Sequence, residues 1–160
     1  MELLSNIVID QYTQGKIDTE MLSLSDHVLL ALANFCAGLY PFATVYVGAQ
    51  QQKVERPALF VDFYSITNQQ RLAATSDYAF GFVVTYVPAN KLSAQELSGA
   101  IFTLQQSLTK IPSDIGELVC YSKSGDVTDQ LANVTGVINV GEIDEPTDPI
   151  ITTAEQELTI

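Results

Sequence analysis

Few residues in this sequence have the type and spacing that chemistry needs. His27 is the single histidine, and no Ser, Cys or acidic side chain stands at a spacing that would make it a general base. A nucleophilic triad would have to be assembled from distant segments, which no pattern here predicts. We interpret His27 as a partly exposed residue near the start of a helix, and we expect no catalytic residues and no enzyme.

Two groups of acidic residues could offer oxygen ligands to a cation. Asp126 and Asp129 belong to the run GDVTD, and Asp144, Glu145 and Asp148 follow nearer the C-terminus. Both groups lack the ordered spacing and the turn glycine of a calcium loop. The phosphate-binding runs GxGxxG and GxxxxGK are also absent from the sequence. We favour solvated acidic loops, so we expect no metal and no cofactor.

Composition argues for a protein that binds other proteins. The chain has 160 residues, of which 47% are hydrophobic and 16% charged, and its net charge is −12. This length fits one domain, and the apolar content exceeds what one soluble monomer buries, so we expect homo-oligomerisation. Only seven Lys and Arg residues are present, which argues against tightly held nucleic acid.

The two cysteines and the hydropathy pattern bear on the compartment. Cys36 and Cys120 form no CxxC pair, and the chain does not begin with a basic segment followed by an apolar one. We favour two buried thiols in a reducing compartment over a disulfide. No uncharged apolar run reaches about 18 residues, so we expect no membrane-spanning segment.

Residues 1–24 predict an N-terminal extension, either a helix or an arm. Their apolar residues fit one helical face, whereas Asn6 to Asp10 fit a short strand equally well. Helix is the favoured interpretation, with Gly15 breaking the segment.

Two later helices are predicted more clearly. The first takes Ser25 as its N-cap and carries an apolar stripe from Val28 to Leu39. The second begins with a capping box formed by Ser93 and Glu96, and Pro112 stops it.

Five strands are predicted from β-branched and aromatic runs. They cover residues 44–48, 57–64, 78–87, 115–122 and 132–140. In the third of these, bulky and small residues alternate, which predicts burial of both faces and a helix packed against the small-residue face. Residues 66–77 read as a polar loop, longer than hairpin loops usually are. We expect either a projecting arm that docks on a partner or a mobile loop without a role.

The fold class is therefore α+β. We predict a single domain with an approximately five-stranded, mostly antiparallel sheet, helices packed on it, and the order α(α)-β-β-β-α-β-β. The chain divides into the extension of residues 1–24, the domain of residues 25–141 and an acidic tail of residues 142–160 that carries six acidic residues and no basic one.

Asp62 stands out because it interrupts an apolar strand. It is exposed at a sheet edge, buried against Arg56 or Arg71, or part of an assembly contact. We favour an edge or interface position over a buried pair.

In the order of these segments and in their residue types, the chain resembles the tail terminator, or tail completion, proteins of tailed bacteriophages and prophages. The similarity rests on a helix ending in LYP, the strands TVYVG, ERPALFVDFY and YAFGFVVTYVP, the capped helix, the strand around LVCYS and the final run GDVTDQLANVTGVINV. It covers about residues 25–141.

This resemblance implies a ring, typically a hexamer, at the head-proximal end of a phage tail. The ring would stop tube polymerisation, bind the tail tube protein and the head-tail connector, and let DNA pass without specific binding. The family has no active site. Our predicted subunit or tube contacts lie on the second strand and its flanks: Lys53, Arg56, Phe60, Asp62, Tyr64, Gln69, Gln70 and Arg71.

Two alternatives stay open at this point. One is another virion part, a head-tail adaptor or a tail tube or baseplate subunit. The other is a monomeric, non-catalytic binding domain whose apolar sheet forms its own core. For the virion roles we expect a place in the tail or neck, with assembly in the cytoplasm of the bacterial host and no membrane.

Overall fold

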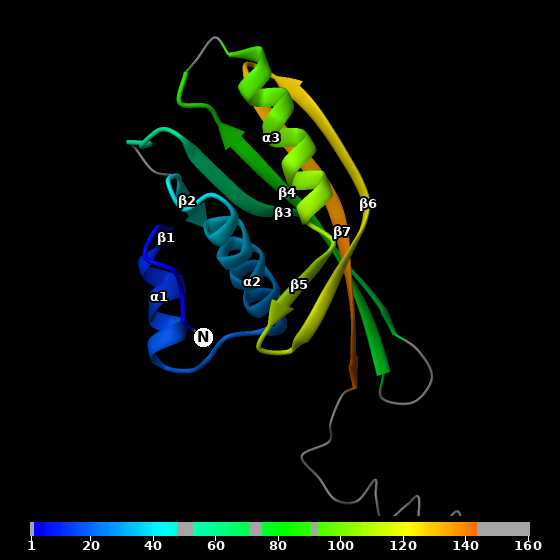
Figure 1. Cartoon of the computed structure of the whole chain (residues 1–160). Coiled ribbons are helices and arrows are strands. Elements are labelled where there is room, and N and C mark those ends of the chain that lie inside the picture. Colours follow the sequence, from blue (N-terminus) through cyan, green and yellow to red (C-terminus); the bar gives the residue numbers. More distant parts are fainter. Residues whose placement is uncertain (1, 48–52, 71–74, 91–92, 144–160) are drawn as a thin grey trace, which may run out of the picture.

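The computed structural model of this chain describes residues 2–47, 53–70, 75–90 and 93–143 (Figure 1). Within these ranges the chain forms three helices and one curled, seven-stranded sheet of order β1-β2-β3-β4-β7-β6-β5. The elements are β1 Ile7–Ile9, α1 Gln11–Asp18, α2 Leu24–Leu39, β2 Thr44–Val47, β3 Ala58–Gln70, β4 Thr75–Val87, α3 Ala94–Ser107, β5 Lys110–Ser113, β6 Gly116–Thr128 and β7 Leu131–Ile143.

The fold is α+β, as predicted, but the sheet differs from the prediction in detail. Seven strands replace about five, and the sheet is mixed because β1 pairs with β2 and β2 with β3 in parallel. The other four pairs are antiparallel. The two additional strands are β1, which the sequence left open between strand and helix, and β5, which was not predicted, and they have three and four residues. Strands this short leave no period-two pattern in the sequence.

The N-terminal segment contributes both a strand and a helix. β1 extends the sheet beside β2, and α1 follows directly. The Asp10 carboxylate accepts a hydrogen bond from the Thr13 N–H at 2.7 Å and so caps α1. Gly15 lies inside α1 and does not end it, because one glycine costs a helix only about 1 kcal/mol. The division of the chain into three parts stays a prediction.

α2 begins slightly earlier than predicted, with Ser23 rather than Ser25 as its N-cap. The Ser23 hydroxyl accepts from the Asp26 N–H, and the Asp26 carboxylate accepts from the Ser23 N–H. This reciprocal pair needs an acidic residue three positions after the cap, where Ser25 has only Val28. Lys16 Nζ lies 3.0 Å from the same carboxylate and ties α1 to the start of α2.

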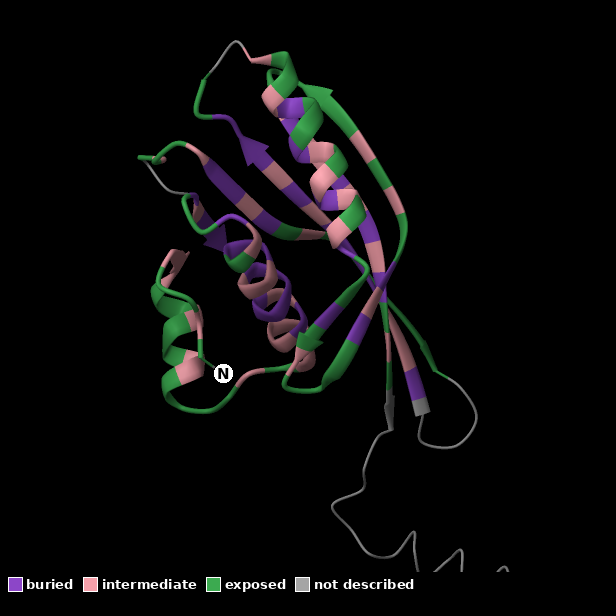
Figure 2. Ribbon diagram, in the orientation of Figure 1, coloured by how far each residue is buried: buried purple, intermediate pink, exposed green. Residues whose placement is uncertain are grey.

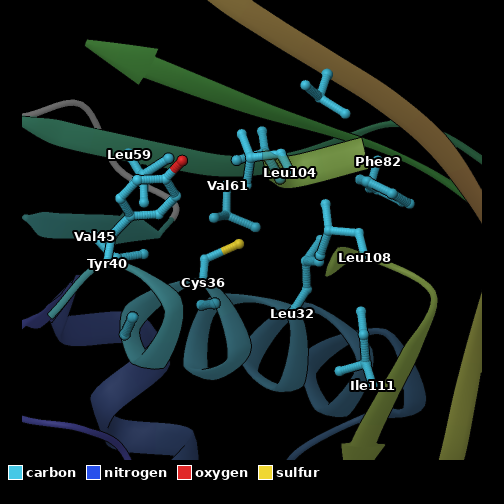
Figure 3. Packing of buried hydrophobic residues seen from close by; sticks show 14 of the residues in the cluster. Leu32, Cys36, Tyr40, Val45, Leu59, Val61, Phe82, Leu104, Leu108 and Ile111 are labelled. Carbon is cyan, nitrogen blue, oxygen red and sulfur yellow. The ribbon is translucent and has the colours of Figure 1, made fainter. Parts of the chain in front are cut away.

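Both α2 and α3 cover one face of the sheet, and burial is concentrated beneath them (Figures 1 and 2). This is the bulky-residue face of β4, where Phe82 belongs to the same buried cluster as Leu32 of α2 and Leu104 of α3 (Figure 3). The predicted helix packing against the small-residue face is wrong, and Val83 on that face is only half-buried. Covering the bulky side removes more apolar area from water, which stabilises the fold more.

α3 begins at the predicted N-cap, Ser93, but Glu96 does not complete a capping box. Its carboxylate accepts instead from the Tyr86 hydroxyl at 2.7 Å and from the Ala89 N–H at 2.8 Å, which joins the end of β4 to α3. Burial acts to raise the pKa of Glu96. The hydrogen bonds outweigh it, so the pKa of this carboxyl lies below its ordinary value.

Two further predictions, both for the chain after α3, are wrong. α3 ends at Ser107, and Pro112 lies in the edge strand β5, where a missing N–H is tolerated. β6 and β7 run beyond their predicted ends and meet at Asp129 and Gln130, whose φ angles of 52° and 63° form a two-residue hairpin turn. Most of the acidic run GDVTD is therefore strand. Residues 144–160 of the predicted acidic tail lie outside the described residues.

Asn6 fastens the N-terminal strand to the end of α2. Its Nδ2 donates to the carbonyl oxygens of Ala37 at 3.2 Å, Tyr40 at 3.2 Å and Ala43 at 2.9 Å. Its own carbonyl accepts from the Val45 N–H at 2.9 Å. The last carbonyls of a helix have no partners within the helix, so this amide stabilises the end of α2.

We expect Asn6→Ala to lower the free energy of unfolding by about 2 kcal/mol, because part-buried carbonyl groups lose their donor. Urea denaturation followed by circular dichroism measures this change. Asn34→Ala is the matched control, since its two hydrogen bonds to the N-terminal segment are exposed to solvent and should contribute less. Equal losses in the two variants would contradict the role given to Asn6.

The lowered pKa of Glu96 predicts pH-dependent stability. Its contribution is complete above the ordinary value of 4.5 and is lost as pH falls through the lower folded-state pKa. Glu96→Gln should therefore be destabilised relative to the parent at pH 7, and this difference should shrink at pH 3. Urea denaturation at pH 7 and pH 3 measures the free energy of unfolding of both proteins, with Glu117→Gln at an exposed position as the control. A difference that is the same at both pH values would refute it.

Candidate functional site

Three strands run on past the helices as a projecting arm (Figure 1). β2 pairs with β3 only as far as Val61, and β6 pairs with β7 only as far as Ile138. Beyond these points β3 and β7 pair only with β4, which lies between them. We call residues 62–70, 75–83 and 139–143 the arm.

The arm overturns the predicted polar loop of residues 66–77. Most of that segment is strand, since β3 continues to Gln70 and β4 begins at Thr75. Residues 71–74 lie outside the described residues. The available signals were Ile66 and Thr67, two β-branched residues in the supposed loop.

The two outer edges of the arm are unpaired within the described residues. The β3 edge from Phe63 to Gln70 contains no charged residue and no proline. Natural sheets usually protect such an edge with Lys, Pro or a covering segment. By contrast, the exposed stretch of β6 carries Lys123 and Asp126 beside a bulge. The arm therefore has the edge that a partner strand would fit.

A bulge at the base of the arm positions an exposed aromatic ring. The pairing of β3 with β4 shifts between Phe63 and Ser65, which leaves Tyr64 as the extra residue. Tyr64 is 58% exposed, and a Cβ added at Gly81 would come closer than 3.0 Å to its ring. The ring thus lies against the glycine backbone on the outer face, the sheet face opposite α2 and α3.

Along the arm and along β6 from Ser124 to Thr128, the outer face is mainly polar and carries only negative charge among the described residues. Its part beside β2 instead holds an apolar cluster that includes Tyr46, Phe60 and Val87.

Asp62, Asp77 and Asp126 are the charged residues of the arm and of this stretch of β6, whereas Lys123 points the other way and donates to the Gln105 carbonyl of α3. Lys110 of β5 and Glu117 of β6 form an ion pair elsewhere on the same sheet face. A groove of about 460 Å³ runs over its arm portion and is lined mainly by hydroxyl, amide and small side chains. Residues lining it include Thr67, Gln69, Ala79, Asn139 and Gly141.

The predicted contact residues do not form one patch. Lys53 and Arg56 are exposed just before β3, whereas Gln69 and Gln70 are exposed at its far end. At about 3.3 Å per residue, the 13 residues of β3 separate these groups by about 40 Å. Arg71 lies outside the described residues.

The remaining predicted contacts lie between these ends. Phe60 is half-buried on the outer face, where its ring stacks on Tyr46 at 5.1 Å. Asp62 is exposed where the free edge of β3 begins, and its carboxylate accepts from the Phe63 N–H. The assignment of all eight residues to contacts stays a prediction. Sequence reasoning missed the β7 side of the arm, residues 139–143.

The groups considered for chemistry lie apart from the arm. Cys36 and Cys120 are free and buried, as predicted, and burial raises their pKa values to about 12 and about 11. His27 lies in α2, half-buried, and its Nδ1 has no hydrogen-bond partner. Within the described ranges, no three His, Cys, Asp or Glu side chains are grouped to hold a metal.

No helix in the described part of the chain has the length and apolar character needed to cross a membrane.

A comparison with protein families gave one match. A family model described as phage tail terminator protein matches residues 23–150, which include the arm and all elements from α2 to β7. No curated protein matches the chain.

Gly81→Ala tests how the outer face of the arm is built. We expect the new methyl group to displace the Tyr64 ring and to lower the free energy of unfolding by about 1 kcal/mol. Gly99→Ala is the control of opposite sign, since nothing lies within 4 Å of a Cβ there and alanine should stabilise α3 by up to about 1 kcal/mol. Thermal melts compare the two variants, and a stabilised Gly81→Ala variant would contradict this packing.

Proposed function

Because the chain belongs to the phage tail terminator proteins, a family of structural virion proteins, we propose that it forms a ring at the head-proximal end of a phage tail. There it ends polymerisation of the tail tube and presents the surface that the head-tail connector binds. It acts without catalysis and without a cofactor.

The observation that carries this proposal is the pair of free edges on the arm. β3 and β7 both run antiparallel to β4, so they run parallel to each other on opposite sides of it. The β3 edge of one subunit can therefore add to the β7 edge of the next and continue the sheet as a parallel pair. A contact between two different surfaces, repeated by rotation, closes into a ring.

The distribution of charge supports one orientation of the arms in this ring. Lys110 and Glu117 pair with each other on β5 and β6, away from the arm. The outer face of the arm and of β6 from Ser124 to Thr128 has three carboxylates and no Lys or Arg among the described residues. If it lines the channel, it repels DNA phosphates and lets the DNA slide without specific binding. The helices then face outward.

The remaining features of the proposal follow from the family. Six subunits are the proposed number, and the ring sits between the tail tube protein and the head-tail connector. Assembly takes place in the cytoplasm of the bacterial host, and the finished ring stays in the neck of the virion.

Engineered disulfides test the edge contact. Thr67, Ala79 and Asn139 form one row across the arm, so residues 67 and 139 of one subunit lie about 10 Å apart. A disulfide cannot span that distance. Three double variants each combine Asn139→Cys with one cysteine on β3: Ser65→Cys, Thr67→Cys or Gln69→Cys. They test three registers of pairing between β7 of one subunit and β3 of the next. We expect one combination to give a ladder of disulfide-linked oligomers on a non-reducing gel.

The four single-cysteine variants are the matched controls and should stay unlinked, because the native cysteines are buried. If no combination gives a ladder, or if the single variants link equally well, the edge contact is wrong.

Electron microscopy with the tube protein of the same phage tests the role itself. We expect closed rings that sit on one end of each tube and shorten the tubes as their concentration rises. Long cylinders formed by this chain alone would identify a tube subunit instead. One 17.4 kDa species that leaves tube length unchanged would identify a monomeric domain.

A further inference from the structure

An apolar notch lies where the arm meets the start of α2. Its volume is about 350 Å³, and its lining joins the start of the helix to the arm: Ser23, Leu24, Ser25, Ile66, Tyr78 and Phe80. Phe80 is buried, but Ile66 is 52% exposed although it lies on the helix side of the sheet. The notch is therefore an open end of the hydrophobic core.

We propose that the C-terminal segment of the same chain docks in this notch through Ile150 and Ile151. These two residues are the only adjacent pair of large apolar residues after Ile143, since Leu158 and Ile160 stand singly among polar and acidic residues. The family match also runs past β7 as far as residue 150, so this stretch belongs to the part of the chain that matches the family.

The length of chain allows this docking. Ile138 pairs with Phe80 beside the notch, and Ile143 lies five residues further along β7. This is about 17 Å along the strand. Seven residues from Ile143 to Ile150 reach about 23 Å when extended, which suffices for the chain to return along the inner face of the arm.

The chemistry of the two partners agrees. Burying two isoleucines against Ile66 and Tyr78 removes apolar surface on both sides from water. Attachment to the same chain gives the segment a high effective concentration at the notch.

Docking within one chain requires no ring and thus stands apart from the proposed function. Its consequence is that a free subunit covers the apolar inner face of its own arm and leaves the two strand edges open for neighbours.

A tryptophan reporter tests the docking, because the chain contains no tryptophan. We expect the emission of the full-length Ile150→Trp variant to be blue-shifted, and its quenching by acrylamide to be several-fold weaker than that of the matched control Ile160→Trp. Adding Ile66→Asp, at a half-exposed position that should still allow folding, should restore red-shifted emission and strong quenching. Circular dichroism verifies that each variant is folded.

Each outcome decides the proposal. A blue shift that Ile66→Asp abolishes and that persists on dilution to the monomer supports it. Emission from Ile150→Trp that matches the control overturns it, as does a blue shift that Ile66→Asp leaves unchanged. A blue shift that disappears on dilution shows that a second copy supplies the segment, which also overturns docking within one chain. Failure to form rings would affect only the proposed function, since the reporter is read in the monomer.

Discussion

The difference in length between the helices and the long strands is the constraint on which this structure depends. α2 has 16 residues and α3 has 14, so at 1.5 Å per residue they span about 24 Å and about 21 Å. β3, β4, β6 and β7 have 13 residues each, which is about 43 Å at 3.3 Å per residue. Two such helices cannot cover strands of this length, so part of the sheet has to extend beyond the core.

The core fixes which part extends. Leu32 and Cys36 of α2 belong to one buried cluster with Phe82 (Figure 3). Asn6 holds the end of α2 against β1 and β2. The sheet then divides at the pair of Cys120 with Ile138, where β6 turns away to join β5 beneath α2. What remains beyond this point is the three-stranded arm, with one strand edge free on each side.

The composition of the arm is typical of a surface that binds other molecules. A free, uncharged strand edge is a liability in a monomer because it pairs with any available strand. In a ring the same edge becomes the contact that holds neighbouring subunits together. The outer face of the arm lies away from the helices, and its hydroxyl, amide and carboxylate groups suit the proposed channel for DNA.

Local patterns in the sequence were sufficient for the features that depend on near neighbours. Ser93 as an N-cap, the apolar stripe of α2 and the buried, unpaired Cys36 and Cys120 agree with the structure. The match to the phage tail terminator family likewise agrees with the resemblance drawn from the order of segments. Ser25 and Pro112 were misjudged as helix boundaries because the outcome depended on Asp26 and on the docking of Ile111 against α2.

The sequence by itself determined the α+β class, the main helices, the long apolar strands and the family, since each of these follows from residue periodicity or residue order. Only the tertiary structure decided that residues 66–70 and 75–77 are strand, that the helices lie on the bulky face of β4, and that Lys53 and Gln70 lie at opposite ends of β3. The physical reason is that a loop and a strand that extends beyond the core contain the same kinds of polar residues. Their conformation depends on the backbone hydrogen bonds of distant neighbours, which a local pattern does not record.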